Sequence, residues 1–314
     1  MAEWLVERGI GETRLVRVQS GEIVEARILL DGVVPAGAVL EARLREAGIP
    51  AVAEADGDEY LLPKGALGTT EGSAIAIEVT RERIPGAEPW KRPLACLAGD
   101  APRSASFPDA ETIPFPSPRD RLGELGWNDL VDEACSGTVR FDCGELRVSP
   151  TPAMTLIDVD GRLAPFDLAL AGARAAARTI VRHGIGGSIG IDLPTVPGRA
   201  ERQAIAAAMD AVLPKPFERT AVNGFGFLQI VRARTHASLF ELATDRPAFE
   251  ARALLRRAAL ARTGATRLAA HPAIVAVLER RAEWLEALGR QVGGSVTLRS
   301  EPALPIHGAY AEAG

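Results

Sequence analysis

The 314-residue chain is predicted to be a mixed α/β, or α+β, protein with a small β-barrel in its N-terminal part. Short alternating apolar and polar runs fill residues 1–88, whereas strand-like and helix-like segments alternate from residue 121 onward. Between them, residues 89–120 are rich in Pro, Ala and Ser, which is typical of a linker. With 47% hydrophobic residues, the chain is large enough to form two domains with separate cores.

The N-terminal region, residues 1–88, is predicted to be all-β. Four alternating runs are separated by Gly-containing turns, and they lie at residues 13–18, 23–29, 38–44 and 75–79. The first three follow one another at intervals of about ten residues, which is typical of small barrels. An OB-fold is one option for this barrel.

Residues 121–240 are predicted to form the second, α/β domain. The expected elements are a short helix at 121–134, a hairpin around Cys143–Gly144, a strand at 155–161, a helix at 167–183, a strand at 186–192, a helix at 198–212, and strands near 217–222 and 225–232. Residues 241–314 are predicted to be a C-terminal extension. It would contain helices at 249–262 and 271–288 and a strand at 295–299.

Two short acidic strands carry the strongest functional signal. Residues 155–161 read T-L-I-D-V-D-G and residues 186–192 read G-G-S-I-G-I-D, with one helix's length of sequence between them. Strands joined by such a crossover lie parallel and close, so Asp158 and Asp192 are expected to converge. Converging carboxylates suit Mg²⁺ or Mn²⁺ and predict metal-assisted phosphate chemistry. The alternative is that both aspartates cap helices or form loops.

Three sequence motifs, taken in their order along the chain, resemble the signatures of the ribonuclease E/G family. They are the two acidic strands and N-G-F-G-F-L-Q-I-V-R-A-R at residues 223–234. The family signatures read approximately T-A-I-D-V-N-S-G, G-G-x-I-x-I-D and F-G-L-x-x-x-x-R-x-R. The resemblance is clearest over residues 145–240.

The resemblance implies an RNase H-like catalytic core that cleaves single-stranded RNA and leaves a 3′-hydroxyl and a 5′-phosphate. Asp158 and Asp192 would be the catalytic residues and would hold Mg²⁺, with Mn²⁺ as the second option. Asp160 stands where the family has an asparagine. It is therefore a candidate third metal ligand, or a group that acts on the metal's ligands without touching the ion, and the alternative is a turn residue before Gly161.

The resemblance also implies that the N-terminal barrel is a degenerate S1-type RNA-binding barrel. The family's two base-stacking phenylalanines would fall near Val52 and Leu61, which are not aromatic, and the neighbouring Tyr60 becomes the RNA-binding candidate. No room is left for the family's 5′-sensor subdomain. The family's zinc-link cysteines are missing from residues 243–247, so no zinc is expected.

Four arginines are further RNA-binding candidates. Arg232 and Arg234 alternate along a predicted strand, so both are expected on one side, at the rim beside the aspartates. Arg174 and Arg178 lie four residues apart on one stripe of a predicted helix. The alternative for each pair is a solvated surface without function.

The composition limits the remaining possibilities. A net charge of −5 predicts weak, salt-sensitive RNA binding. The chain has no long apolar run and no signal-peptide pattern, so we expect a cytoplasmic protein without a membrane contact. The sequence contains no phosphate-binding loop, so no nucleotide cofactor is expected. The sequence does not indicate the oligomeric state.

The sequence therefore predicts a shortened, Mg²⁺-dependent endoribonuclease acting on single-stranded RNA. The main alternative is a non-catalytic RNA-binding or ribosome-associated protein that retains the nuclease scaffold. A third possibility is a Mg²⁺-dependent phosphotransferase or phosphatase with a similar core.

Overall fold

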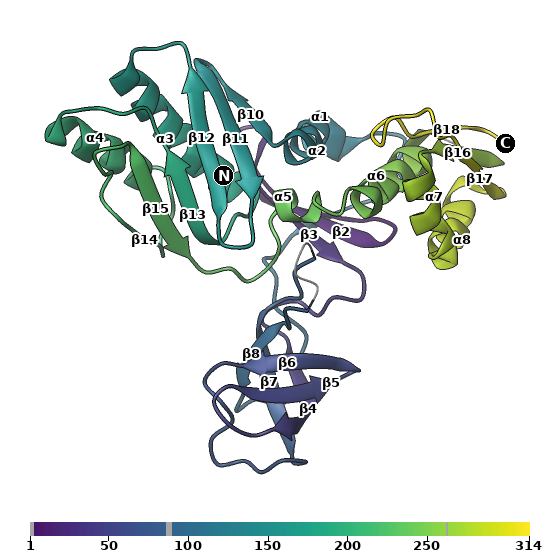
Figure 1. Cartoon of the computed structure of the whole chain (residues 1–314). Helices are drawn as coiled ribbons and strands as arrows, with labels where there is room; N and C mark the ends of the chain where they lie inside the picture. The colour runs from purple at the N-terminus through teal and green to yellow at the C-terminus, as the bar shows by residue number, and fades with distance from the viewer. Residues whose placement is uncertain (1–2, 86–89, 262) are drawn as a thin grey trace. The chain divides into compact units, whose positions relative to one another are not determined.

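The computed structural model describes residues 3–85, 90–261 and 263–314 (Figure 1). The chain divides into two compact units, and each is assembled from separate stretches of sequence. Unit 1 consists of Met1–Asp31, Asp109–Cys135 and Leu242–Gly314. Unit 2 consists of Gly32–Pro108 and Ser136–Glu241.

Unit 1 contains two sheets and most of the C-terminal helices. Its elements are β1 (Glu3–Arg8), β2 (Glu12–Gln19), β3 (Glu22–Leu30), β9 (Glu111–Ile113), α1 (Arg121–Glu124), α2 (Trp127–Ser136), α6 (Arg246–Ala261), β16 (Thr266–Ala270), α7 (Pro272–Glu279), α8 (Ala282–Val292), β17 (Val296–Ser300) and β18 (Tyr310–Ala313). The first sheet has the order β3-β2-β1-β9, in which β9 runs parallel to β1, and the second has the order β17-β16-β18.

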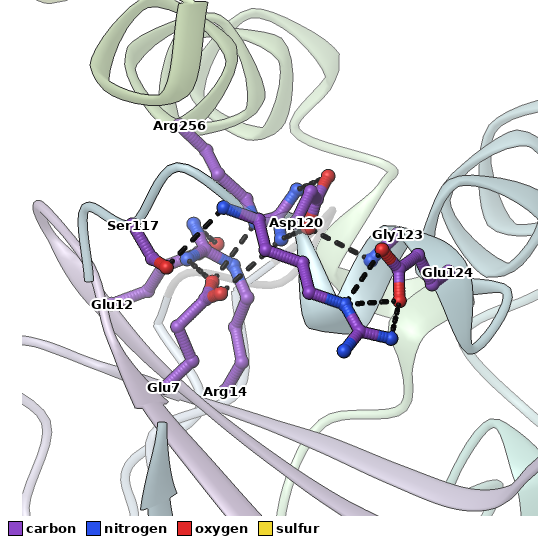
Figure 2. Close-up of polar contacts among 9 residues, drawn as sticks. Glu7, Glu12, Arg14, Ser117, Asp120, Gly123, Glu124 and Arg256 are labelled. Atoms are coloured by element: carbon purple, nitrogen blue, oxygen red, sulfur yellow. Dashed lines mark hydrogen bonds and ion pairs between the residues drawn. The ribbon is translucent and has the colours of Figure 1, made fainter. Parts of the chain in front are cut away.

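Helix α6 packs on the first sheet through buried charges as well as apolar side chains. Figure 2 shows the centre of this cluster, in which Arg14 donates a hydrogen bond to Glu7 at 2.8 Å and pairs with Glu12 at 2.6 Å. Arg256 of α6 donates to Glu7 at 2.9 Å and to Asp120 at 2.5 Å. Burial alone would raise the pKa of the Glu12 carboxyl, but Arg14 and Arg252 hold it below its ordinary value. Each buried charge named here therefore has an opposite partner.

The first part of unit 2 is a closed five-stranded barrel. Its strands are β4 (Val39–Glu46), β5 (Ala51–Ala55), β6 (Asp58–Leu62), β7 (Ala74–Arg81) and β8 (Leu94–Leu97), in the order β4-β5-β6-β8-β7. Alternate residues point inward and form an apolar core that includes Leu44, Leu62 and Ile77. The prediction of a small β-barrel in the N-terminal part of the chain is confirmed.

The extent of the barrel differs from the prediction. Strands β1–β3 lie within residues 1–88 but belong to the first sheet of unit 1, and β8 and β9 lie within the predicted linker 89–120. The predicted extension 241–314 belongs almost entirely to unit 1, together with the N-terminal strands. Alternation identifies a strand but not the strand with which it pairs, so the two sheets could not be separated from the sequence. The predicted boundary at 88/89 falls outside the described residues.

The second part of unit 2 is a six-stranded sheet covered on one face by helices. Its elements are β10 (Thr138–Phe141), β11 (Gly144–Pro150), β12 (Thr155–Gly161), α3 (Pro165–Arg182), β13 (Gly187–Asp192), α4 (Arg199–Asp210), β14 (Glu218–Arg219), β15 (Phe227–Arg232) and α5 (Leu239–Leu242). The strand order is β10-β11-β12-β13-β15-β14. Strands β10, β11 and β12 form an antiparallel meander, β12 and β13 are parallel, and β15 is antiparallel to β13.

Helices α3 and α4 pack beside each other against this sheet (Figure 1). Gly172 of α3 lies against Val159 of β12, because a Cβ at Gly172 would stand only 2.3 Å from Val159 Cγ1. Ile157 and Val159 therefore face the helices. Since successive side chains of a strand alternate, Asp158 and Asp160 point to the opposite face, which we call the open face.

The protein is thus a mixed α+β structure with a closed five-stranded barrel and, among the described residues, eight helices. The description of residues 121–240 as an RNase H-like core stays a prediction. None of the helices in the described ranges is both long enough and apolar enough to span a membrane.

Candidate functional site

The two predicted aspartates are direct neighbours in the sheet. Strands β12 and β13 are paired in parallel with Asp158 opposite Asp192, and the preceding residues Ile157 and Ile191 are paired and buried. Because adjacent strands lie about 4.8 Å apart, the two carboxylates stand side by side on the open face. Both side chains are exposed to solvent. The structure therefore brings together the pair that the sequence singled out.

The pair is electrostatically strained in the absence of a cation. Partial burial and then the nearby carboxylates of Asp160 and Asp192 raise the pKa of Asp158 above its ordinary value of 3.8. A hydrogen bond from the Val159 backbone and the positive charge of Arg147 act in the opposite direction but do not cancel the rise. A bound cation would relieve this repulsion.

Asp160 does not complete a three-carboxylate site. It lies two residues beyond Asp158 on β12, about 6.7 Å along the strand, and its cross-strand neighbour is Glu145. Within the described ranges, no group of three or more His, Cys, Asp or Glu side chains is arranged to hold a metal ion. The prediction that Asp160 is a third direct ligand is therefore not supported by the arrangement.

The remaining pair still fits Mg²⁺. This ion dehydrates reluctantly and is commonly held by one or two carboxylates together with waters and substrate phosphates. Asp158 and Asp192 supply two exposed carboxylates with open solvent beside them. The donor set therefore suits an ion that keeps several waters, and it is less suited to a fully enclosed structural metal.

Arg147 is a candidate that the sequence analysis missed. It lies on β11 directly across from Asp158, and its guanidinium also pairs with Glu145 at 2.5 Å. The position of Arg147 follows from the turn between β11 and β12. There the backbone N–H and the hydroxyl of Thr151 donate hydrogen bonds to the Met154 carbonyl, and Pro150 pairs with Thr155. Counting back from that turn places Arg147 opposite Asp158.

Arg232 and Arg234 do not lie beside the aspartates. Because β15 is antiparallel to β13, Asp192 pairs with Phe227, whereas Arg232 pairs with Gly187 at the far end of the strand. Phe227 and Arg232 are five residues apart along β15, which corresponds to about 17 Å. Arg234 lies beyond β15 and forms an ion pair with Glu241. The prediction placed these residues at the wrong end because it did not consider the direction of β15.

The other predicted RNA contacts are also separated from the aspartates. Arg174 and Arg178 are exposed on α3, which covers the face of the sheet opposite to the carboxylates. Tyr60 is only 2% exposed and belongs to the core of the barrel. Burial and the nearby Asp58 and Asp56 raise the pKa of its hydroxyl to about 12. Tyr60 therefore cannot stack on a base without unfolding the barrel.

The third motif, at residues 223–234, begins with a turn that packs against the end of β13. The Asn223 side chain accepts hydrogen bonds from the backbone N–H groups of Phe225 at 2.9 Å and Phe227 at 3.0 Å. Gly226 has φ +91°, and a Cβ there would stand 2.1 Å from the carbonyl oxygen of Leu193. The Gly226 carbonyl accepts a hydrogen bond from the Leu193 N–H at 3.3 Å. This glycine therefore lets the turn close directly against the residue after Asp192.

No protein-family model matches the chain, and no curated protein matches it. The resemblance to the ribonuclease E/G family therefore rests on the three sequence motifs and stays a prediction.

Proposed function

We propose that the protein is a Mg²⁺-dependent endoribonuclease that cleaves single-stranded RNA. The observation that carries this proposal is the pairing of Asp158 with Asp192 on the open face of the sheet. The raised pKa of Asp158 supports it, because the carboxylates repel each other until a cation is bound. The RNase H-like character of this core belongs to the same proposal and rests on the order of its elements, a meander followed by a helix and a parallel strand.

Four charged residues of the open face have a defined part in this proposal. Asp158 and Asp192 hold the divalent ion, which when bound polarises a phosphate oxygen and makes water a stronger nucleophile at neutral pH. Arg147 offsets the negative charge of the phosphate from the neighbouring strand. Asp160 acts on the pair through its charge rather than as a direct ligand. Products with a 3′-hydroxyl and a 5′-phosphate are expected from the family resemblance.

One observation favours the alternative of a non-catalytic RNA-binding protein. The described residues contain no group of three potential metal ligands, so the proposed ion would be held by two carboxylates. Such a site binds Mg²⁺ weakly in the absence of substrate phosphates. A protein that has lost activity could retain the same two strands.

Cleavage of an end-labelled, AU-rich single-stranded RNA in Mg²⁺ and in EDTA tests the proposal. Wild type would be compared with Asp158→Asn, Asp192→Asn and the control Asp167→Asn, which alters a carboxylate in the first turn of α3. We expect Mg²⁺-dependent cleavage by wild type and the control, and its loss in the two site variants. RNA binding without cleavage by wild type, in Mn²⁺ as well as Mg²⁺, would favour the non-catalytic alternative. Equal cleavage by all four proteins would indicate a contaminant and refute the site.

A further inference from the structure

The open face carries apolar side chains next to the carboxylate pair. Met154, Leu156 and Phe227 meet above Gly190, where an added Cβ would stand 2.6 Å from the Phe227 ring, 3.0 Å from Leu156 and 3.1 Å from the Met154 sulfur. We call Met154, Leu156 and Phe227 the apolar shelf. Leu156 is 39% exposed even though it lies in the middle of the sheet.

The shelf and the carboxylates form one continuous surface. Phe227 is the cross-strand neighbour of Asp192, and Leu156 precedes Asp158 by two residues on the same face of β12. Gly190 lies between them, opposite Leu156 on the neighbouring strand, and leaves room for the shelf side chains to approach. An apolar surface that reaches across β13, from β12 to β15, therefore adjoins the site proposed for a phosphate.

Phe225 lies two residues before Phe227, in the turn that leads into β15. Its side chain is 84% exposed, the highest value among the large exposed hydrophobic side chains of the described residues. Its backbone is nevertheless held in place, because the Asn223 side chain accepts its N–H and the Thr195 hydroxyl donates to its carbonyl at 3.0 Å. A phenyl ring on a fixed backbone loses little entropy when a flat partner stacks on it.

We propose that Phe225 and the apolar shelf bind a nucleobase of single-stranded RNA beside the Asp158–Asp192 pair. This inference rests on the proposed function and identifies the part of the substrate that this surface binds. A nucleobase has an apolar, stackable face and is linked to a phosphate only a few ångströms away, so one nucleotide can place its base on the shelf and a phosphate near the carboxylates. Because every base has such a face, the contact is expected to tolerate different sequences.

The test measures binding of a fluorescein-labelled single-stranded RNA decamer to the full chain by anisotropy, in EDTA and about 50 mM salt. Under these conditions metal-dependent cleavage does not interfere. Phe225→Ala and Phe225→Leu should raise Kd about 5- to 150-fold, as expected for the loss of one base stack, whereas Phe225→Trp should stay near wild type. Val231→Ala is the matched control, because Val231 is 49% exposed on the open face but lies toward the far end of β15.

A second ligand tests whether the contact is to a base. A decamer that is abasic at every position keeps the phosphates and should bind wild type and Phe225→Ala equally. Wild-type affinity in Phe225→Ala or in Phe225→Leu would overturn the proposal, as would a difference that persists with the fully abasic decamer. All variants should keep the wild-type circular dichroism spectrum and melting temperature, since Phe225 is exposed.

The outcomes separate this inference from the proposed function. If wild type cleaves RNA but binding is independent of Phe225, only the base site is wrong. If binding depends on Phe225 but wild type never cleaves, the base site is supported and the nuclease activity is not. If wild type does not bind the decamer at all, the base site is wrong, and the cleavage assay in Mg²⁺ alone decides the nuclease proposal.

Discussion

Replacing Asp158 by Asn should stabilise the metal-free protein and also remove its stabilisation by Mg²⁺. Asp158 and Asp192 are paired across parallel strands, so the two charges lie about 5 Å apart. In a medium as polar as water, this repulsion is about 0.8 kcal/mol, and the nearby Arg147 reduces it. We therefore expect a gain of about 0.5 kcal/mol, which corresponds to a rise of ~1–2 °C in the melting temperature.

The same prediction has a defined pH dependence. The pKa of Asp158 is raised in the folded protein, so the folded state binds this proton more tightly than the unfolded chain does. The stability that the protonated carboxyl contributes is complete below the ordinary value of 3.8 and is lost as the pH rises through the raised pKa. The stability difference between Asp158→Asn and wild type should therefore grow from acidic toward neutral pH.

Adding Mg²⁺ should make wild type more stable than Asp158→Asn. At a Mg²⁺ concentration ten times Kd, binding to the folded state adds about 1.4 kcal/mol to wild type and nothing to Asp158→Asn. Thermal melting in EDTA and in a Mg²⁺ series measures both effects, with Asp167→Asn as the control, whose rise in melting temperature with Mg²⁺ should equal that of wild type. A variant less stable than wild type in EDTA would refute the electrostatic reasoning. An equal Mg²⁺ effect on both proteins would refute the site.

Three further predictions concern other parts of the molecule. Arg256→Met should lower the free energy of unfolding by about 1.5–3 kcal/mol in a denaturant titration, because Glu7 keeps Arg14 as a partner but loses its hydrogen bonds from Arg256, whereas Arg119→Met at an exposed ion pair should leave the stability nearly unchanged. Gly226→Ala should lower the melting temperature and kcat/KM together, because a Cβ at φ +91° meets the chain after β13. Arg147→Ala should lower kcat/KM about tenfold or more, and Arg232→Ala should stay within about twofold of wild type. The reverse order would mean that the substrate lies at the other end of the sheet.

Local patterns predicted the central part of the site, because the necessary information lay within one βαβ unit. Apolar strands ending in carboxylates, separated by one helix's length, are enough to place Asp158 beside Asp192. The hairpin turn before Thr155 would also have placed Arg147, since a short turn fixes the register of both strands. The existence of most strands and helices was predictable for the same local reason.

The predictions failed where the position of a residue or the partner of a strand depended on parts of the chain that are distant in sequence. Whether β15 runs parallel or antiparallel to β13 decides the position of Arg232, and alternation is the same in both cases. Tyr60 has the same alternation whether it faces solvent or the barrel core, and closure of the barrel buries it. The partners of β1–β3 could not be known because β9 and α6 lie about a hundred and about 240 residues later.

The two units differ in how their carboxylates are paired with positive charges. In unit 1, Glu7 and Glu12 are buried, and arginines from β2 and α6 are paired with them. On the open face of unit 2, Asp158 and Asp192 are adjacent, and the nearest cross-strand cation, Arg147, is already paired with Glu145. A Mg²⁺ ion would bring the positive charge that relieves this repulsion, and this is the role that our proposal gives it.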